Sequence, residues 1–254
     1  MMSAMPLRTV IPSHKRHDKV FAKKLVTDPI ICVAESQADL YRRFNPECEI
    51  VTHPDDIIGL IPKRNWMARH FGDLFMLDDD VHAVKNLMAE KGEPTVIKDP
   101  AQITHIIESL YEIACMLDVH VFGFTSRISP VMYDETAYLS LSKMITGCSY
   151  GVRYNKNVWW NEEIRLKEDF WISCYMKYKE RRILTDLRYN FAQKSTFVNE
   201  GGLASIRNQD EERRAIMFIK KHFGDSINMK GKTRNGKDET RQLVEYNISC
   251  KFKF

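Results

Sequence analysis

The segment Leu74–Asp80 constrains this chain more than any other, because its apolar run ends abruptly in three consecutive aspartates. The four apolar residues are typical of a buried strand in a parallel sheet. Ligands of open α/β sheets bind at the carboxyl ends of such strands, where Asp78, Asp79 and Asp80 are expected to lie. Neighbouring carboxylates repel one another, and a divalent cation with oxygen ligands relieves that repulsion most directly. The segment therefore predicts a metal site, and the alternative is a solvated acidic turn.

The composition is that of a compact protein made in a reducing compartment. A chain of 254 residues with 44% apolar residues allows one large domain or two small ones with a sizeable core. Residues 1–16 contain no hydrophobic run long enough for a signal peptide or a membrane span. The six cysteines lack C-x-x-C pairing, so we expect reduced core thiols. The sequence therefore predicts a cytoplasmic protein without a membrane partner, and its net charge of +4 does not by itself indicate a polyanion partner.

Strand-like and helix-like segments alternate through the first half of the chain, which favours an α/β fold. We expect strands at residues 8–11, 30–34, 49–52 and 74–77, and helices at residues 18–25 and 59–71. Pro62 stands in the first turn of the second helix, where proline is tolerated. The first strand runs into a polar loop that begins at Pro12, and the second strand ends in Glu35.

The second half predicts three helices, two further internal strands and a strand at the carboxyl end. Capping-box spacing marks helices that begin at Asp99 and Asn208, and a third helix spans residues 165–182. Strands are expected at residues 119–125 and 145–154, and the glycines of the latter indicate that its backbone approaches something closely. The basic stretch 230–241 is expected to be a mobile loop, and the alternation at residues 244–254 is typical of a half-buried strand.

Five short motifs follow one another along the chain. They are Pro12-Ser13-x-x-Arg16, the strand-ending Glu35, the helix start Lys63-Arg64-Asn65, the triplet with Asp78 and Asp80, and the pair Glu168-Asp169. In this order they resemble a glycosyltransferase of the GT-A fold. Within that fold the chain is similar to the small phage-type TET-associated glycosyltransferases, which glycosylate hydroxymethylated pyrimidines in DNA, over roughly residues 7–210.

The resemblance implies one GT-A-like α/β domain over residues 1–223, with a Rossmann-like, mostly parallel central sheet flanked by helices. The nucleotide-sugar half would extend to about residue 85 and the acceptor half over residues 86–223. A C-terminal extension, residues 224–254, would pack on the same domain. It also implies a nucleotide-sugar donor, of the UDP-sugar class, and DNA containing 5-hydroxymethylcytosine as acceptor, in the cytoplasm of a host cell if the chain is phage-encoded.

The aspartates would then serve the leaving group of a sugar transfer. A diphosphate gains negative charge as the glycosidic bond breaks, and a divalent ion bridging its oxygens stabilises that charge. By the resemblance, Asp78 and Asp80 bind the ion and Asp79 contacts the donor sugar. Oxygen ligands suit both Mg²⁺ and Mn²⁺, so the sequence does not choose between them. His14, His53, His82 and His222 include no convincing third ligand, since the helix dipole alone favours a histidine at a helix end such as His222.

The remaining donor contacts are expected on three of the motifs, and the whole cofactor-binding set is Pro12, Ser13, Arg16, Glu35, Lys63, Arg64, Asn65 and Asp79. Arg16, Lys63 and Arg64 would neutralise the diphosphate, helped by the positive end of the helix near Pro62. For Lys63 and Arg64 the alternative is a plain solvated helix start. Glu35 would accept a hydrogen bond from the base or ribose, and its alternative is an ordinary surface position.

The acceptor hydroxyl is a poor nucleophile, so we expect a carboxylate that takes its proton, an effect worth about 10²–10⁴-fold. Asp169 is the expected base, with Glu168 as its substitute, and an inverting displacement would follow; a retaining outcome stays open. Alternatively, both acids simply favour the amino end of their helix.

The nucleic-acid acceptor rests on two weaker features. The basic residues Lys230, Lys232, Arg234, Lys237, Arg241, Lys251 and Lys253 would follow phosphates, and Tyr150, Tyr154, Trp159 and Trp160 would stack on an exposed base. Both sets are equally compatible with ordinary surface and core. Enzymes that modify a base in duplex DNA extrude it, so this reading predicts a cleft near Asp169.

Other functions stay open on the sequence. They are a glycosyltransferase with a carbohydrate acceptor, a metal-dependent nucleotidyltransferase and a non-catalytic DNA-binding module. No pattern indicates an oligomeric state.

Overall fold

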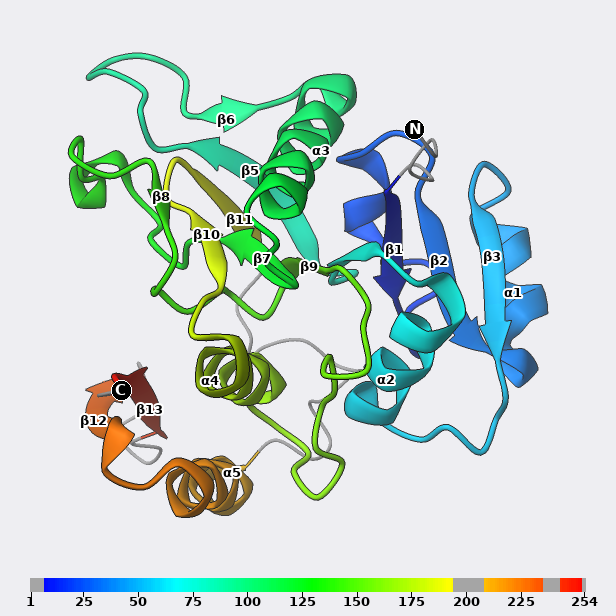
Figure 1. Cartoon of the computed structure of the whole chain (residues 1–254). Helices are drawn as coiled ribbons and strands as arrows, with labels where there is room; N and C mark the ends of the chain where they lie inside the picture. The colour runs from blue at the N-terminus through cyan, green and yellow to red at the C-terminus, as the bar shows by residue number, and fades with distance from the viewer. Residues whose placement is uncertain (1–6, 194–207, 235–242, 253–254) are drawn as a thin grey trace.

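The computed structural model describes residues 7–193, 208–234 and 243–252 (Figure 1). Its helices are α1 (Ala38–Phe44), α2 (Leu60–Phe71), α3 (Pro100–Met116), α4 (Glu168–Glu180) and α5 (Gln209–Phe223), with short 3₁₀ turns η1 (Phe21–Lys24), η2 (Glu35–Gln37), η3 (Pro130–Met132) and η4 (Gly224–Ser226). Its strands are β1 (Arg8–Pro12), β2 (Ile30–Ala34), β3 (Glu49–His53), β4 (Leu74–Leu77), β5 (Val81–Asn86), β6 (Val96–Ile97), β7 (Val121–Phe124), β8 (Leu139–Ser140), β9 (Ser149–Val152), β10 (Leu184–Asp186), β11 (Tyr189–Gln193), β12 (Ile227–Arg234) and β13 (Leu243–Cys250).

An eight-stranded sheet in the order β3-β2-β1-β4-β9-β7-β10-β8 forms the centre of the molecule. The strands from β3 to β4 are parallel, as are β7 and β10, whereas β9 and β8 run antiparallel to their neighbours. A smaller sheet, β11-β5-β6, and the hairpin β12-β13 complete the described strands. The prediction of an α/β protein with a largely parallel central sheet is therefore confirmed, with the qualification that the sheet is mixed.

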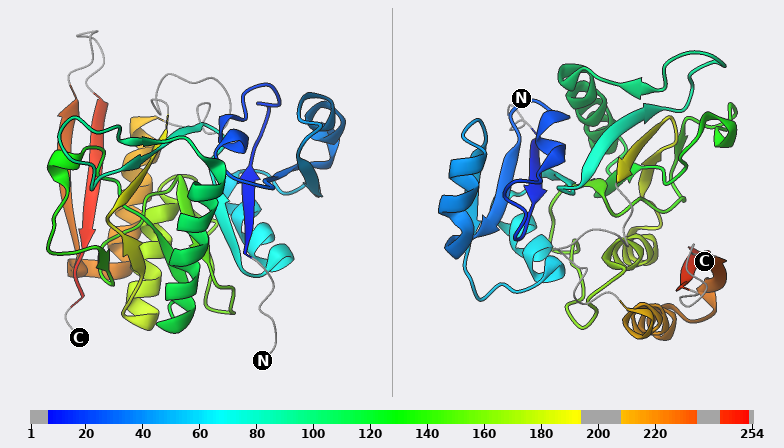
Figure 2. Two further views of the ribbon diagram at one scale, coloured as in Figure 1. Left: turned by 90° about the horizontal axis from the view of Figure 1, so that it is seen from above. Right: turned by 180° about the vertical axis from the view of Figure 1, so that it is seen from behind.

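Helices cover both faces of the central sheet, and Figures 1 and 2 show α3 on one face with α2 and α4 on the other. One apolar cluster joins α2, α4 and α5 to side chains of β1, β2 and β4. A second cluster joins α3 and η1 to the opposite side chains of the same strands. The strands β2 and β4 read as apolar runs in the sequence because they are buried on both faces.

The strand predicted at residues 145–154 contains two glycines, and the close approach expected there is found at the second, Gly151, in β9. This residue pairs with Phe122 on β7, and a Cβ at Gly151 would overlap the ring of Phe122. Phe122 is completely buried, so its ring cannot move away into solvent. Glycine is thus required at position 151 because the neighbouring strand places an aromatic side chain directly over it.

Most of the predicted long elements appear with boundaries shifted by a few residues. Asp99 and Asn208 cap α3 and α5 as predicted, accepting hydrogen bonds from the backbone N–H of Ala101 and Glu211 respectively. The helix expected at residues 18–25 is only the 3₁₀ turn η1. The structure adds α1 and the short strands β5, β6, β8, β10 and β11, which have two to six residues and little periodic signal.

The basic stretch before the carboxyl end differs from its prediction. Residues 230–234 belong to β12 and are not a loop, because they pair with the alternating residues of β13 in a hairpin. Residues 235–241 lie outside the described residues. The predicted terminal strand is confirmed over most of its length as β13. Its end packs on the domain, since Lys177 on α4 donates a hydrogen bond to the carbonyl of Cys250 at 2.6 Å.

The described cysteines are free, as expected, and those at positions 32, 148, 174 and 250 are buried. None of the described helices is long and apolar enough to cross a membrane.

Replacing Gly151 with alanine should lower the free energy of unfolding by about 1–3 kcal/mol, because the added methyl overlaps a buried ring in a packed core. Urea denaturation of the two proteins measures the change. The matched control is Phe122→Leu, which opens space over Gly151. In the double variant the alanine should cost about 1 kcal/mol less than in the parent protein, and fully additive losses would contradict this account.

Candidate active site

The topology brings three loops to one edge of the central sheet. The parallel strands β1 and β4 are neighbours, so the loops that follow Pro12 and Leu77 leave the sheet side by side. The antiparallel strand β9 begins at this edge, and the backbone N–H of Asp78 donates to the carbonyl of Cys148 at 2.9 Å. The first and fourth sequence motifs therefore meet in space, although more than 60 residues separate Ser13 from Asp79.

Asp79, the middle aspartate, holds these loops together. Its two carboxylate oxygens accept hydrogen bonds from the Ser13 hydroxyl at 2.6 Å and from Nη1 of Arg16 at 2.8 Å. Its carbonyl accepts a third from the backbone N–H of Phe21 at 2.8 Å. Burial raises the pKa of Asp79, and Ser13, Arg16 and Lys63 oppose that shift. Because both carboxylate oxygens have protein partners, the structure gives Asp79 a structural role, and a direct contact with the donor stays a prediction.

The outer aspartates, Asp78 and Asp80, share one partner. Nε2 of Gln193 donates to Oδ2 of Asp78 at 3.1 Å and to Oδ1 of Asp80 at 3.0 Å. Nη1 of Arg16 lies 3.7 Å from Oδ2 of Asp80. No sequence motif marks Gln193, and its position depends on β11, a strand whose only sequence signal is a brief alternation around Phe191.

The electrostatic environment of this pair disfavours two negative charges. Burial raises the pKa of Asp78 to about 7, and the neighbouring charges of Asp80, Glu168 and Asp79 act in the same direction, whereas Arg64 opposes them. Burial and Asp79 likewise raise the pKa of Asp80. A bound cation would reverse this effect by favouring the ionised carboxylates.

The side chains present suit a hard divalent cation. Asp78 and Asp80 offer carboxylate oxygens from one loop, and the Gln193 amide, which now donates to both, also carries a carbonyl oxygen. Within the described ranges, no group of three or more histidine, cysteine, aspartate or glutamate side chains is placed to hold a metal. Of the histidines, His222 is exposed at the end of α5, and His53 is buried with its Nδ1 2.9 Å from the carbonyl of Pro54.

The Lys63-Arg64-Asn65 motif turns inward from the first turns of α2. All three side chains are buried, so the alternative of a solvated helix start for Lys63 and Arg64 is wrong. Nζ of Lys63 donates to the carbonyl of Ser13 at 2.8 Å, which joins α2 to the loop after β1. Asn65 bonds both the N–H and the carbonyl of Trp160, at 3.0 and 2.8 Å, and so fixes the segment before α4.

Arg64 is completely buried and connects the aspartates to the acid pair at the start of α4. Its Nη2 donates to Oδ1 of Asp78 at 3.1 Å, to Oε1 of Glu168 at 3.3 Å and to the carbonyl of Gly147 at 3.0 Å. The guanidinium also lies 4.9 Å from the centre of the Tyr150 ring. Burial lowers the pKa of Arg64, but Tyr150 and the carboxylates of Asp78 and Glu168 together raise it further, so the side chain stays charged.

Glu168 and Asp169 occupy different environments. Glu168 is buried against Arg64, whereas Asp169 is partly exposed. Burial and the charge of Glu168 raise the pKa of Asp169 to about 6, and the neighbouring Lys167 and Arg64 oppose the shift. A Cβ at Gly147 would lie 3.0 Å from Oδ2 of Asp169. The first glycine that was predicted to allow a close approach therefore makes room for this carboxylate.

The other predicted residues lie in several different settings. Glu35 is exposed at the start of η2, and Pro12 ends β1. Tyr150 and Trp160 are completely buried, so the prediction that they stack on a base is wrong; the packed core holds them. Tyr154 and Trp159 remain 38% and 40% exposed. Of the basic residues between Lys230 and Lys253 that are expected to follow nucleic-acid phosphates, only Lys251 has a described side chain, and it is exposed.

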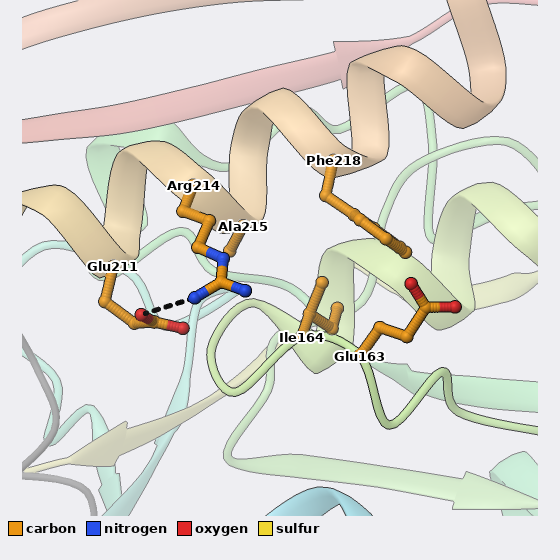
Figure 3. Close-up of a pocket in the computed structure, with 6 residues that line it drawn as sticks. All are labelled: Glu163, Ile164, Glu211, Arg214, Ala215 and Phe218. Atoms are coloured by element: carbon orange, nitrogen blue, oxygen red, sulfur yellow. Dashed lines mark ion pairs between the residues drawn. The ribbon is translucent and has the colours of Figure 1, made fainter.

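A cavity of about 250 Å³ lies away from the predicted site, between α5 and the loop that precedes α4 (Figure 3). Its lining residues are Glu163, Ile164, Glu211, Arg214, Ala215 and Phe218. None of them belongs to the five sequence motifs.

A model of the TET-associated glycosyltransferase family matches residues 7–202. The chain belongs to this family. It is therefore a glycosyltransferase, and the family implies a sugar donor and suggests a role in DNA modification. This finding confirms the resemblance and excludes the alternatives of a nucleotidyltransferase and a non-catalytic DNA-binding module. No curated protein matches the chain. The match contains every residue of the five motifs and ends before α5.

If Asp169 is the base, replacing Gly147 with alanine should lower the rate of sugar transfer by less than the roughly 10²-fold that a 1 Å misplacement can cost, because the new methyl displaces the Asp169 carboxylate by only a few tenths of an ångström. Steady-state rates of the two proteins measure this loss. If the effect runs through Asp169, adding Gly147→Ala to Asp169→Asn should cost little further activity. Multiplicative losses in the double variant would show that Gly147 acts elsewhere.

Proposed function

We propose that this glycosyltransferase has a GT-A-type active site and transfers a sugar from a UDP-sugar to the hydroxyl of 5-hydroxymethylcytosine in DNA, with Mn²⁺ or Mg²⁺ as cofactor. One observation carries the proposal. The outer aspartates Asp78 and Asp80 face a common partner at the sheet edge, and Arg64 connects them to the Glu168-Asp169 pair. Arg64 thus links the aspartates by hydrogen bonds to Glu168, the residue directly before the candidate base Asp169.

On the donor side, Asp78 and Asp80 would hold the cation, which stabilises negative charge on the leaving diphosphate when it is bound. Arg16 lies beside Asp80 and adds positive charge at the same edge. The ammonium of Lys63 donates one hydrogen bond to the carbonyl of Ser13, and its other two N–H groups would be able to donate to a phosphate oxygen. Arg64 is buried among protein partners, so its part is to hold Asp78 and Glu168 in place.

On the acceptor side, Asp169 is the better candidate for the base. Glu168 is buried, and its Oε1 lies 3.3 Å from Nη2 of Arg64, so protein groups enclose it. Asp169 is partly exposed, and with a pKa of about 6 it is mostly ionised at neutral pH and still basic enough to accept a proton. Direct attack by the acceptor assisted by one base leads to inversion at the sugar carbon.

The DNA acceptor is supported by the family and by the position of the exposed aromatic side chains. Trp159 is 40% exposed on the segment that leads from β9 to α4, so it lies on the same stretch of chain as the acid pair. Residues up to about 85 would form the nucleotide-sugar half, residues 86–223 the acceptor half, and residues 224–254 an extension of the same domain. A carbohydrate acceptor is the alternative.

Mass spectrometry of hydroxymethylcytosine-containing DNA, incubated with the protein and a panel of nucleotide sugars, tests this proposal. A mass gain of one sugar is expected with a UDP-sugar and Mn²⁺, and chelation should abolish it. Asp80→Asn should remove donor turnover, and Asp169→Asn should lower transfer by about 10²-fold or more while the protein stays folded. Transfer to an oligosaccharide and not to DNA would overturn the acceptor assignment.

Cation binding should be strongly dependent on pH. The bound cation needs ionised carboxylates, and the pKa of Asp78 without cation is about 7. Mn²⁺ affinity should therefore fall about tenfold for each unit of pH below 7 and level off above about pH 8. Isothermal titration calorimetry between pH 5.5 and 8.5 measures this. Asp78→Asn is the control, with weaker binding and a shallower pH dependence. Constant affinity down to pH 5 would contradict the environment described for Asp78.

A further inference from the structure

The turn that leads into α4 has an unusual backbone conformation. Lys167, the residue directly before Glu168, has φ 65° and ψ 33°, which is the left-handed helical region. A side chain with a Cβ is disfavoured there, and no side-chain hydrogen bond caps the helix at this residue. The direction in which Glu168 and Asp169 leave the turn depends on this conformation. Another contact therefore has to hold Lys167 in place.

That contact comes from α5. Nζ of Lys167 lies 2.8 Å from Oε2 of Glu212, and the two side chains are only 14% and 8% exposed. The same ammonium lies 5.3 Å from the centre of the Phe170 ring, one turn into α4. Solvent and salt screen such a sheltered ion pair much less than a surface pair.

Glu212 itself is held rigidly, because α5 packs on α4 through a continuous apolar face. Trp171 on α4 lies 5.9 Å from Phe218 and 5.4 Å from Phe223, measured between ring centres. Figure 3 shows the same helix against the loop before α4, where Ala215 and Phe218 face Ile164. The helix lies beyond residue 202, where the family match ends.

We propose that Glu212 is a positioning residue for the acid pair: from α5 it holds Lys167, so that the left-handed turn presents Asp169 to the substrate with the Lys167 ammonium beside it. This rests on the proposed role of Asp169 as base. The C-terminal part of the chain then completes an active site whose other residues lie within the family match.

The pKa of Asp169 depends on where the Lys167 ammonium lies. The groups that face Asp169 are Glu168 and Lys167 on its own segment, Arg64 from α2, Tyr150 from β9 and Cys174 from the next turns of α4. Of these, Lys167 and Arg64 are the positive charges, and both stabilise the ionised form of Asp169. Without Glu212, the Lys167 ammonium would lose its carboxylate partner and turn toward water, and Asp169 would lose that stabilisation.

A purely remote electrostatic effect predicts the opposite sign. If Glu212 acted only as a distant negative charge, its removal would make the surroundings of Asp169 more positive and lower the pKa of that carboxyl. If Glu212 positions Lys167, its removal raises the pKa. The direction of the shift therefore separates a positioning residue from a bystander.

Carboxyl-carbon NMR titration of the full chain measures this shift, with the Asp169 signal assigned by its loss in Asp169→Asn. Glu212→Gln and Lys167→Met should each raise the pKa of Asp169 and lower sugar transfer about two- to fivefold more at pH 6 than at pH 8. Lys167→Arg, which keeps the ion pair, should leave both unchanged. Glu211→Gln is the matched control, since Glu211 is the adjacent residue of α5 and its ion pair with Arg214 is long, at 4.0 Å.

An unmoved or lowered pKa of Asp169 in Glu212→Gln would overturn the proposal, as would an equal shift in the Glu211→Gln control. If Glu212→Gln does not fold, Glu212→Asp takes its place: it keeps the charge but shortens the reach to Lys167, so it should also raise the pKa of Asp169, and an unmoved pKa would overturn the proposal. The NMR titration needs no substrate, so it also separates this inference from the proposed function. If the variants show the expected pKa shifts but the parent protein transfers no sugar, only the proposed function is rejected.

Discussion

The buried guanidinium of Arg64 is the group on which the candidate active-site region depends. Removing such a charge from water costs on the order of several kcal/mol, and the protein offsets that cost with two carboxylates, a carbonyl and an aromatic ring. These partners belong to the ends of β4 and β9 and to the start of α4. The one cation thus fixes the relative position of three segments that are distant in the sequence, and it requires both Asp78 and Glu168 to stay close to each other.

The three consecutive aspartates divide into two functions for a simple geometric reason. The backbone N–H of Val81 donates to the carbonyl of Asp78 at 3.2 Å, so the three aspartates lie in a turn, which directs the first and third side chains to one amide and the second to the loop after β1. Asp78 and Asp80 accordingly meet the Gln193 amide, and Asp79 turns back to Ser13 and Arg16. The middle aspartate thereby anchors the loops that carry the outer two.

Much of the fold could be predicted because its long elements carry strong local signals. The apolar runs of β1, β2 and β4 and the periodic faces of α3 and α5 are readable from neighbouring residues alone. The short strands β5 and β11 were missed because they are stabilised by pairing with each other across about 100 residues of chain, and a window of sequence contains no trace of that pairing. Gln193 is the last residue of β11, so its contact with Asp78 and Asp80 could not be predicted either.

The sequence by itself determined the family, the order of the five motifs and the sheet edge shared by the loop after Pro12 and the aspartates, because strand direction and motif order are properties of the chain. Only the tertiary structure decided what each side chain touches. In the folded protein the side chains of Arg64, Tyr150 and Trp160 are buried in the core. Gln193 contacts the aspartates, and Glu212 contacts Lys167. Side-chain direction and burial depend on packing between distant segments, and charged groups take their acidity from those surroundings, so local sequence does not contain this information.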